Sequence, residues 1–122
     1  MTTRYGFSPE EWTAAMEEMR QALIERAKLR GMIPYSELVE NIKTIELQPN
    51  SFALAAMLGE LSSEEDAVGR GMLSVIVVHK EGDMQPGPGF FELAGELGRD
   101  TSDILVCWVE ELKTVHRVWS GK

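Results

Sequence analysis

Three side chains near one predicted turn could support acid–base or metal chemistry: His79, Asp83 and Glu92. An imidazole beside carboxylates can act as a general base or bind a divalent metal ion. No hydrolase or metal-binding motif surrounds this histidine, so we interpret His79 as a half-buried packing residue. The sequence therefore predicts no catalytic residue, no metal site and no cofactor. A small hydrolase that uses His79 as its base is kept as an alternative.

Two other features could carry chemistry, and both have structural explanations. Gly87-Pro88-Gly89 precedes a predicted helix at Phe90, where glycines can let backbone amides approach a phosphate. Pro88 removes one of these amides and Glu92 adds negative charge, which favours a rigid turn from strand to helix. Cys107 is the single cysteine, and its place between Val106 and Trp108 predicts a buried, reduced thiol.

Composition narrows the class of protein. The chain has 122 residues, 43% of them hydrophobic, which predicts one globular domain spanning residues 1–122. Twenty acidic residues against twelve basic ones give a net charge of −8, which repels the phosphate backbone of nucleic acids. The start of the chain does not resemble a signal peptide, and the longest apolar run, Val75–Val78, is too short to span a bilayer. We expect a cytoplasmic protein that does not contact membranes.

Two long helices are predicted to enclose the rest of the chain. The first begins at Pro9, with Ser8 and Glu11 as a capping box, and Gly31 is its expected end. Its apolar residues recur at helical spacing: Trp12, Met16, Met19, Leu23 and Ala27. The second is expected to be capped by Thr101 or Ser102. Its apolar face is predicted to consist of Ile104, Leu105, Trp108, Leu112, Val115 and Trp119.

Between the long helices, short elements alternate with turns. Short helices are predicted over 34–42 and 51–58, the second ending near Gly59. Ser62 and Glu65 are expected to open a separate helical turn that closes at Gly69. Alternating side chains predict a strand over 73–79, which pairs back through Met84 and Gln85 as a small hairpin before a short helix from Phe90 to Leu97.

This order predicts an α+β fold that is mostly helical, with a winged helix-turn-helix-like core, a small hairpin and long N- and C-terminal helices. In that fold the helix over 51–58 would read DNA, but it lacks the Arg, Lys, Gln and Asn side chains that contact base edges. Three cations could still contact phosphates: Lys43, Arg70 and Lys80.

Two segments resemble a group of small uncharacterised bacterial proteins. They are 69–80, Gly-Arg-Gly-Met-Leu-Ser-Val-Ile-Val-Val-His-Lys, and 86–94, Pro-Gly-Pro-Gly-Phe-Phe-Glu-Leu-Ala. The resemblance implies a bacterial origin and a shared core, without an activity. Residues 34–38 and the strand over 73–79 also resemble the winged DNA-binding domain of alkylguanine transferases. The Pro-Cys-His-Arg motif of those enzymes is absent, so this resemblance supports the fold and not alkyl transfer.

The sparse chemistry favours a non-enzymatic binding domain that acts through protein contacts or self-association. Aromatic side chains are the candidate interface, with Trp119 favoured because it ends the last helix: Phe90, Phe91, Trp119 and Tyr35. The main alternative is a winged-helix regulator associated with DNA, which would need a local cationic face despite the net charge.

Overall fold

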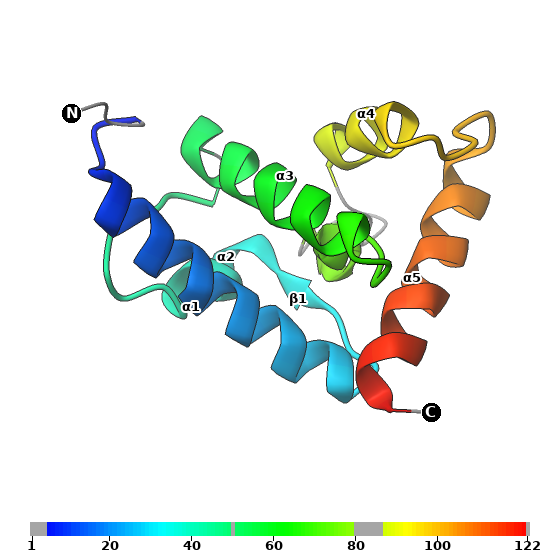
Figure 1. Ribbon diagram of the computed structural model, residues 1–122, viewed down its shortest axis with the longest axis horizontal. Coiled ribbons are helices and arrows are strands. Elements are labelled where there is room, and N and C mark those ends of the chain that lie inside the picture. The colour runs from blue at the N-terminus through cyan, green and yellow to red at the C-terminus, as the bar shows by residue number, and fades with distance from the viewer. Residues whose placement is uncertain (1–4, 50, 80–86, 122) are drawn as a thin grey trace.

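The computed structural model describes residues 5–49, 51–79 and 87–121 (Figure 1). These residues form a mostly helical structure with one two-stranded parallel sheet, which confirms the predicted α+β class at this level. No described helix is long and apolar enough to cross a membrane. The elements in chain order are α1 (Pro9–Lys28), β1 (Ile33–Pro34), α2 (Tyr35–Glu40), α3 (Phe52–Ala67), the 3-10 helix η1 (Leu73–Ile76), β2 (Val77–Val78), α4 (Pro88–Glu96) and α5 (Ile104–Ser120).

Helix α1 starts as its sequence predicts. The Glu11 N–H donates to Ser8 Oγ at 3.1 Å and the Ser8 N–H donates to Glu11 Oε1 at 2.8 Å, which completes the capping box. The predicted apolar residues are buried. The end of the helix differs from the prediction. Helix α1 stops at Lys28. The residue in the left-handed conformation after it is Arg30, with φ of 55°, and not Gly31.

Helix α3 is one continuous helix, so the predicted break near Gly59 and the separate turn opened by Ser62 and Glu65 are wrong. Ser51 caps the helix by accepting the Leu54 N–H at 3.1 Å. Ser62 and Glu65 are both buried inside the helix and bond to other elements through their side chains. A glycine within a helix costs only about 1 kcal/mol, which this packing outweighs.

The strand predicted over 73–79 is also wrong over most of its length. Leu73–Ile76 form η1, and only Val77–Val78 form a strand, β2, which pairs in parallel with Ile33–Pro34. Every residue from Leu73 to Val78 is buried. Because the run is covered on all sides, its alternation does not distinguish a buried from an exposed sheet face. The predicted hairpin through Met84 and Gln85 lies outside the described residues.

The buried run lies at the centre of the molecule. Helices α1, α3 and α5 all contact η1, while α4 packs against α3 (Figure 1). Trp108 on α5 donates its indole N–H to Val75 O at 3.1 Å, and Ser62 Oγ lies 2.6 Å from Ser74 Oγ. The cap of α5 is Asp103, not Thr101 or Ser102, and its carboxylate accepts the Leu105 and Val106 N–H groups.

Gly71 is expected to be intolerant of a side chain. Its φ is +87°, and an added Cβ would lie 3.0 Å from Glu111 Oε2 and 3.3 Å from both Thr114 and Val115. A left-handed backbone conformation by itself costs a residue with a Cβ about 1–2 kcal/mol. Gly71→Ala should therefore lower the free energy of unfolding, measured by urea denaturation, by more than this amount.

Gly69 supplies a matched control for this substitution. Its φ is +81°, and nothing lies within 4 Å of the position that a Cβ would take. Gly69→Ala should cost only the backbone term of about 1–2 kcal/mol. Equal losses in the two variants would contradict close packing of Gly71 against α5.

Candidate functional site

A cavity of about 330 Å³ lies between α3 and α4 and brings together residues from distant parts of the chain. Buried Leu54, Leu58 and Phe90 form apolar walls, while Phe52 and Ala55 are exposed at its edge. The whole described lining consists of Tyr35, Pro49, Ser51, Phe52, Leu54, Ala55, Leu58, Gly59, Ser74, His79, Gly87, Gly89, Phe90 and Leu93. The cavity is therefore largely apolar, as sites for small organic ligands are.

Tyr35 and His79 give the cavity a polar side. Tyr35 Oη accepts the Gly87 N–H at 3.0 Å, and the Tyr35 and His79 rings lie 5.1 Å apart, tilted by 38°. A Cβ on Gly87 would lie 3.3 Å from Tyr35 Oη and 3.5 Å from His79 Nε2. The phenol and the imidazole thus converge on the cap of α4, where an added Cβ would be tight against the phenol and in ordinary contact with the imidazole.

The phenol of Tyr35 keeps its proton at neutral pH. Burial raises the pKa of Tyr35 above its ordinary value of 10.0, and the hydrogen bond from the Gly87 N–H offsets part of that rise. Because Oη accepts from Gly87, its own O–H can still donate, and no described residue accepts that proton. This side of the cavity can therefore donate a hydrogen bond to a ligand.

Of the three candidate acid–base residues, the structure describes two, His79 and Glu92. His79 is exposed, so its interpretation as half-buried is wrong, and Asp83 lies outside the described residues. Glu92 is exposed on α4. Within the described part of the chain, no three His, Cys, Asp or Glu side chains are placed to hold a metal ion.

Cys107 and the glycine-proline segment are placed as the sequence predicts. Cys107 is buried, and burial followed by the charge of Glu111 raises the pKa of its thiol above the ordinary value of 9.0. A thiol with a raised pKa is a poor nucleophile at neutral pH. Gly87 is the N-cap of α4 and Pro88 its first residue, which confirms the predicted turn into a helix.

Of the candidate phosphate contacts, the structure describes Arg70 and Lys43. Arg70 hydrogen-bonds Glu65 through Nε at 2.6 Å and lies over the Trp119 ring, 5.4 Å from its centroid. The side chain of Lys43 is exposed, beside a backbone N–H that donates to Glu18 Oε1 at 3.1 Å. Lys80 lies outside the described residues.

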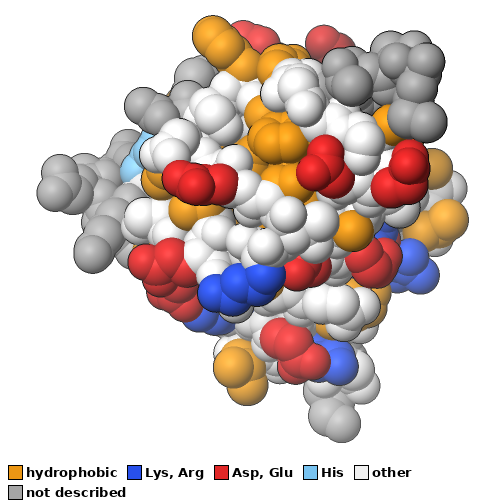
Figure 2. All heavy atoms as spheres, turned by 90° about the vertical axis from the view of Figure 1, so that its left-hand side faces the viewer, with side chains coloured by type: hydrophobic (Ala, Val, Ile, Leu, Met, Phe, Trp, Pro, Cys, Tyr) orange, Lys and Arg blue, Asp and Glu red, His pale blue; other side chains and the backbone are white. Residues whose placement is uncertain are grey.

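The aromatic residues predicted to form an interface are buried or half-buried against other residues of the chain. Phe90 is buried and contacts Phe91 edge to face, with ring centroids 5.2 Å apart. Tyr35 is half-buried in the cavity wall, and Trp119 is half-buried beneath Arg70. The aromatic ring most open to solvent is instead Phe52, 85% exposed at the first position of α3. The face on which α1 and α3 begin carries hydrophobic side chains bordered by Asp and Glu (Figure 2).

The first turn of α5 is apolar and exposed. Ile104, Leu105 and Val106 open α5 and are 50%, 52% and 55% exposed, so the apolar face predicted for this helix is not buried at Ile104 and Leu105. We call these three residues the apolar turn. The available signal was their adjacency, because three consecutive residues of a helix cannot all face one core.

The surroundings of the apolar turn are acidic. Asp100, Asp103 and Glu110 line the same small depression as Val106. Arg99 lines it too, but its guanidinium is paired with Asp66 and Glu111. Ser102 donates to Asp100 Oδ1 through both its N–H and its hydroxyl. These two hydrogen bonds hold the pKa of Asp100 below its ordinary value, the backbone bond contributing most. Negative charge therefore persists beside the apolar turn well below neutral pH.

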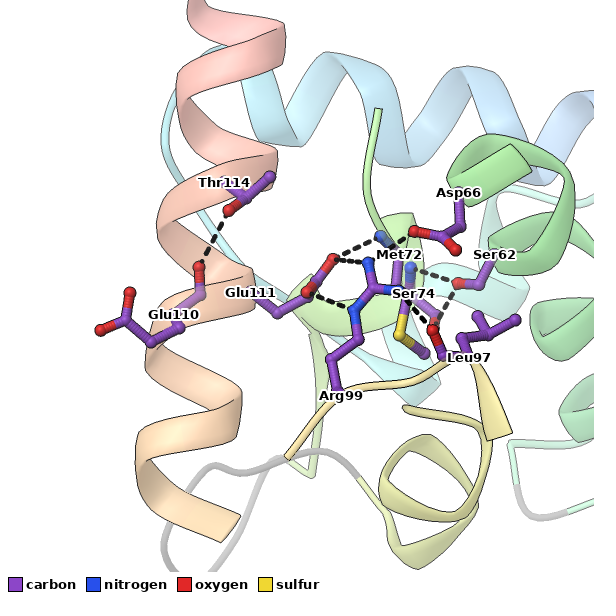
Figure 3. Close-up of polar contacts among 9 residues, drawn as sticks. All are labelled: Ser62, Asp66, Met72, Ser74, Leu97, Arg99, Glu110, Glu111 and Thr114. Atoms are coloured by element: carbon purple, nitrogen blue, oxygen red, sulfur yellow. Dashed lines mark hydrogen bonds and ion pairs between the residues drawn. The ribbon is translucent and has the colours of Figure 1, made fainter. Parts of the chain in front are cut away.

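Two ion networks fix the helices that carry these surfaces. In the first, Arg99 lies between Asp66 on α3 and Glu111 on α5, at 2.5 and 3.0 Å, and Glu111 also accepts the Met72 N–H at 2.8 Å (Figure 3). The hydrogen bonds that Arg99 donates to Asp66 and then to Glu111 raise the pKa of Arg99. In the second, buried Glu65 bonds Arg20 on α1 and Arg70.

No protein-family model, curated protein or solved structure matches this chain.

Proposed function

We propose that this protein is a cytoplasmic, non-enzymatic binding module that contacts a partner protein through the apolar turn. One observation carries the proposal: the three consecutive aliphatic side chains at the start of α5 are each about half exposed. Isolated apolar side chains on a surface are ordinary, whereas contiguous ones mark interaction sites.

The geometry of a helix explains why this exposure is unusual. Consecutive helical residues point about 100° apart, so the three side chains of the apolar turn spread over roughly half of the helix circumference. Further along α5, Cys107, Glu111 and Val115 are buried on one face. The first turn of α5 therefore extends beyond the core that buries this face of the helix. A partner could cover the turn from more than one side.

The charges beside the apolar turn favour a basic partner over a second copy of this chain. Asp100, Asp103 and Glu110 would face their own equivalents if two copies met symmetrically, and like charges at an interface oppose association. A partner surface with aliphatic residues flanked by Lys or Arg would instead bury the turn and pair with these carboxylates. The chain's net charge of −8 would speed the encounter with such a partner.

A pair of synthetic peptides tests this proposal. The first is an amphipathic helix of Leu and Lys, and the second has every Lys replaced by Glu. We expect the Lys peptide to shift the amide resonances of residues 104–110, with an affinity that falls as salt is added, and the Glu peptide to leave them unchanged. Leu105→Asp should lower the affinity for the Lys peptide by about tenfold or more, since it removes a central apolar contact.

Val68→Asp is the matched control, because Val68 is 61% exposed at the end of α3 and outside the apolar turn. It should bind the Lys peptide as the native chain does. Equal weakening in both variants, or shifts that map elsewhere, would refute the proposed surface. Sedimentation that detects a dimer abolished by Leu105→Asp would also overturn it, because the turn would then be occupied by a second copy.

The winged-helix regulator remains a weaker candidate, and no observation among the described residues favours it. Helix α3 would be its recognition helix, yet it carries no Arg or Lys. Arg70 would have to leave Glu65 and Trp119 to reach a phosphate.

A further inference from the structure

We propose that the cavity between α3 and α4 binds a medium-chain aliphatic carboxylate as a small-molecule ligand. The apolar chain would occupy the space between the two helices, and the carboxylate would lie beside Tyr35 and His79. The site is separate from the apolar turn and does not depend on the function proposed there.

The size of the cavity sets the size of the ligand. A volume of about 330 Å³ lies at the lower end of the range for small-molecule sites. At about 30 Å³ for each water-sized group, it holds on the order of ten non-hydrogen atoms. Octanoate is of that size.

The walls explain why the body of the ligand should be aliphatic. Leu54, Leu58 and Phe90 are almost fully buried and present carbon atoms to the cavity, while Leu93 closes the side formed by α4. Burying an alkyl chain against such walls contributes about 0.8 kcal/mol for each CH₂ group. A ligand that is polar along its length would lose hydration there without gaining hydrogen bonds.

The polar side explains why the ligand should end in a hydrogen-bond acceptor. The bond from the Gly87 N–H uses a lone pair of Tyr35 Oη and not its proton, and no described residue accepts that proton. The His79 ring lies 5.1 Å from the Tyr35 ring and directs Nε2 toward the same glycine. A carboxylate beside this pair could accept from the phenol and from an imidazole N–H.

The two donors and the helix termini beside the cavity favour a carboxylate over an ammonium group. The sequence has 20 acidic residues, yet no Asp or Glu is among the described residues that line the cavity. The N-caps of two helices, Ser51 of α3 and Gly87 of α4, both border it. The partial positive charge at the start of a helix adds to the preference for an anion that the lining and the two donors already set.

The test is a titration of the full chain with octanoate, 1-octanol and octylammonium, followed by amide chemical shifts in ¹H–¹⁵N spectra. We expect octanoate to shift the resonances of Phe52, Leu58, Gly87 and Phe90, and to bind about tenfold tighter than 1-octanol, the value of one charge-assisted hydrogen bond. Octylammonium should bind more weakly than either. Equal binding of octanoate and 1-octanol, or tighter binding of octylammonium, would overturn the carboxylate assignment.

Two variants locate the site. Ala55→Trp places an indole at the exposed edge of the cavity and should lower the affinity for octanoate by about tenfold or more. Ala67→Trp makes the same change at an exposed position at the end of α3 and should have no effect. His79→Phe keeps a ring beside Tyr35 and should remove most of the preference for octanoate over 1-octanol. Unchanged octanoate affinity in Ala55→Trp, or an unchanged preference in His79→Phe, would refute the proposed pose.

Discussion

Replacing Glu111 by leucine is expected to lower the free energy of unfolding by about 3–5 kcal/mol, the usual cost of removing one partner of a buried ion pair. The Glu111 side chain is 7% exposed and bonds both Arg99 and the Met72 N–H. Leucine would leave that amide buried without its acceptor and leave Arg99 with Asp66 as its remaining carboxylate. Urea denaturation at neutral pH measures the loss.

The neighbouring residue supplies the control for this prediction. Glu110 is exposed on α5, and Glu110→Leu should change stability by no more than about 0.5 kcal/mol. Glu111→Gln should fall between the two, since the amide oxygen can still accept the Met72 N–H while the charge is lost. A loss in Glu111→Leu as small as that in Glu110→Leu would contradict the structural role of the network.

Replacing Glu65 by glutamine is expected to cost about 3 kcal/mol at neutral pH, and the cost should shrink in acid. Burial by itself raises the pKa of Glu65, but hydrogen bonds and charge from Arg70 and Arg20 outweigh it and hold the pKa below the ordinary 4.5. A carboxyl with a depressed pKa stabilises the fold above its unfolded pKa and loses that contribution as the pH falls through its folded pKa.

This linkage sets the measurement. The difference in unfolding free energy between the native chain and Glu65→Gln should be constant above pH 4.5 and decrease steadily below it. Glu64→Gln is the control, because Glu64 bonds Arg20 at 2.6 Å but is 51% exposed, and exposed pairs contribute less than about 1 kcal/mol. A difference between native chain and Glu65→Gln that does not depend on pH would show that Glu65 is not held as a paired carboxylate.

Two polar networks, the Arg99 network and the hydrogen bonds between Ser62 and Ser74, also explain how the proposed surfaces are held. Arg99 joins the end of α3 to α5, and Asp103 caps α5 a few residues further on, so the apolar turn starts from a fixed point. Ser62 and Ser74 hold α3 against η1, and Ser74 also lines the cavity. Loss of either network should therefore weaken binding only through stability, whereas Leu105→Asp and Ala55→Trp should weaken it in a folded chain.

The sequence by itself determined the features that depend on neighbouring residues. Ser8, Pro9 and Glu11 specify the start of α1 because a capping box needs only a single turn of chain. The apolar spacing of α1 and the burial of Cys107 were likewise readable, since a long helix has one period and one buried face. The mostly helical α+β class followed from these elements.

Only the tertiary structure decided the features that depend on residues far apart. Ser62 and Glu65 look like a helix start, and their burial inside α3 depends on Ser74, Arg20 and Arg70. The apolar run over 73–78 alternates like a strand, but helices on every side let its first four residues adopt a 3-10 turn. The cavity joins Tyr35, Phe52 and Gly87, and the apolar turn is exposed because the core ends before it. Local spacing shows only that three adjacent helical residues cannot all face one core. Where the separate helices meet decides which of these residues stay exposed and where the cavity lies.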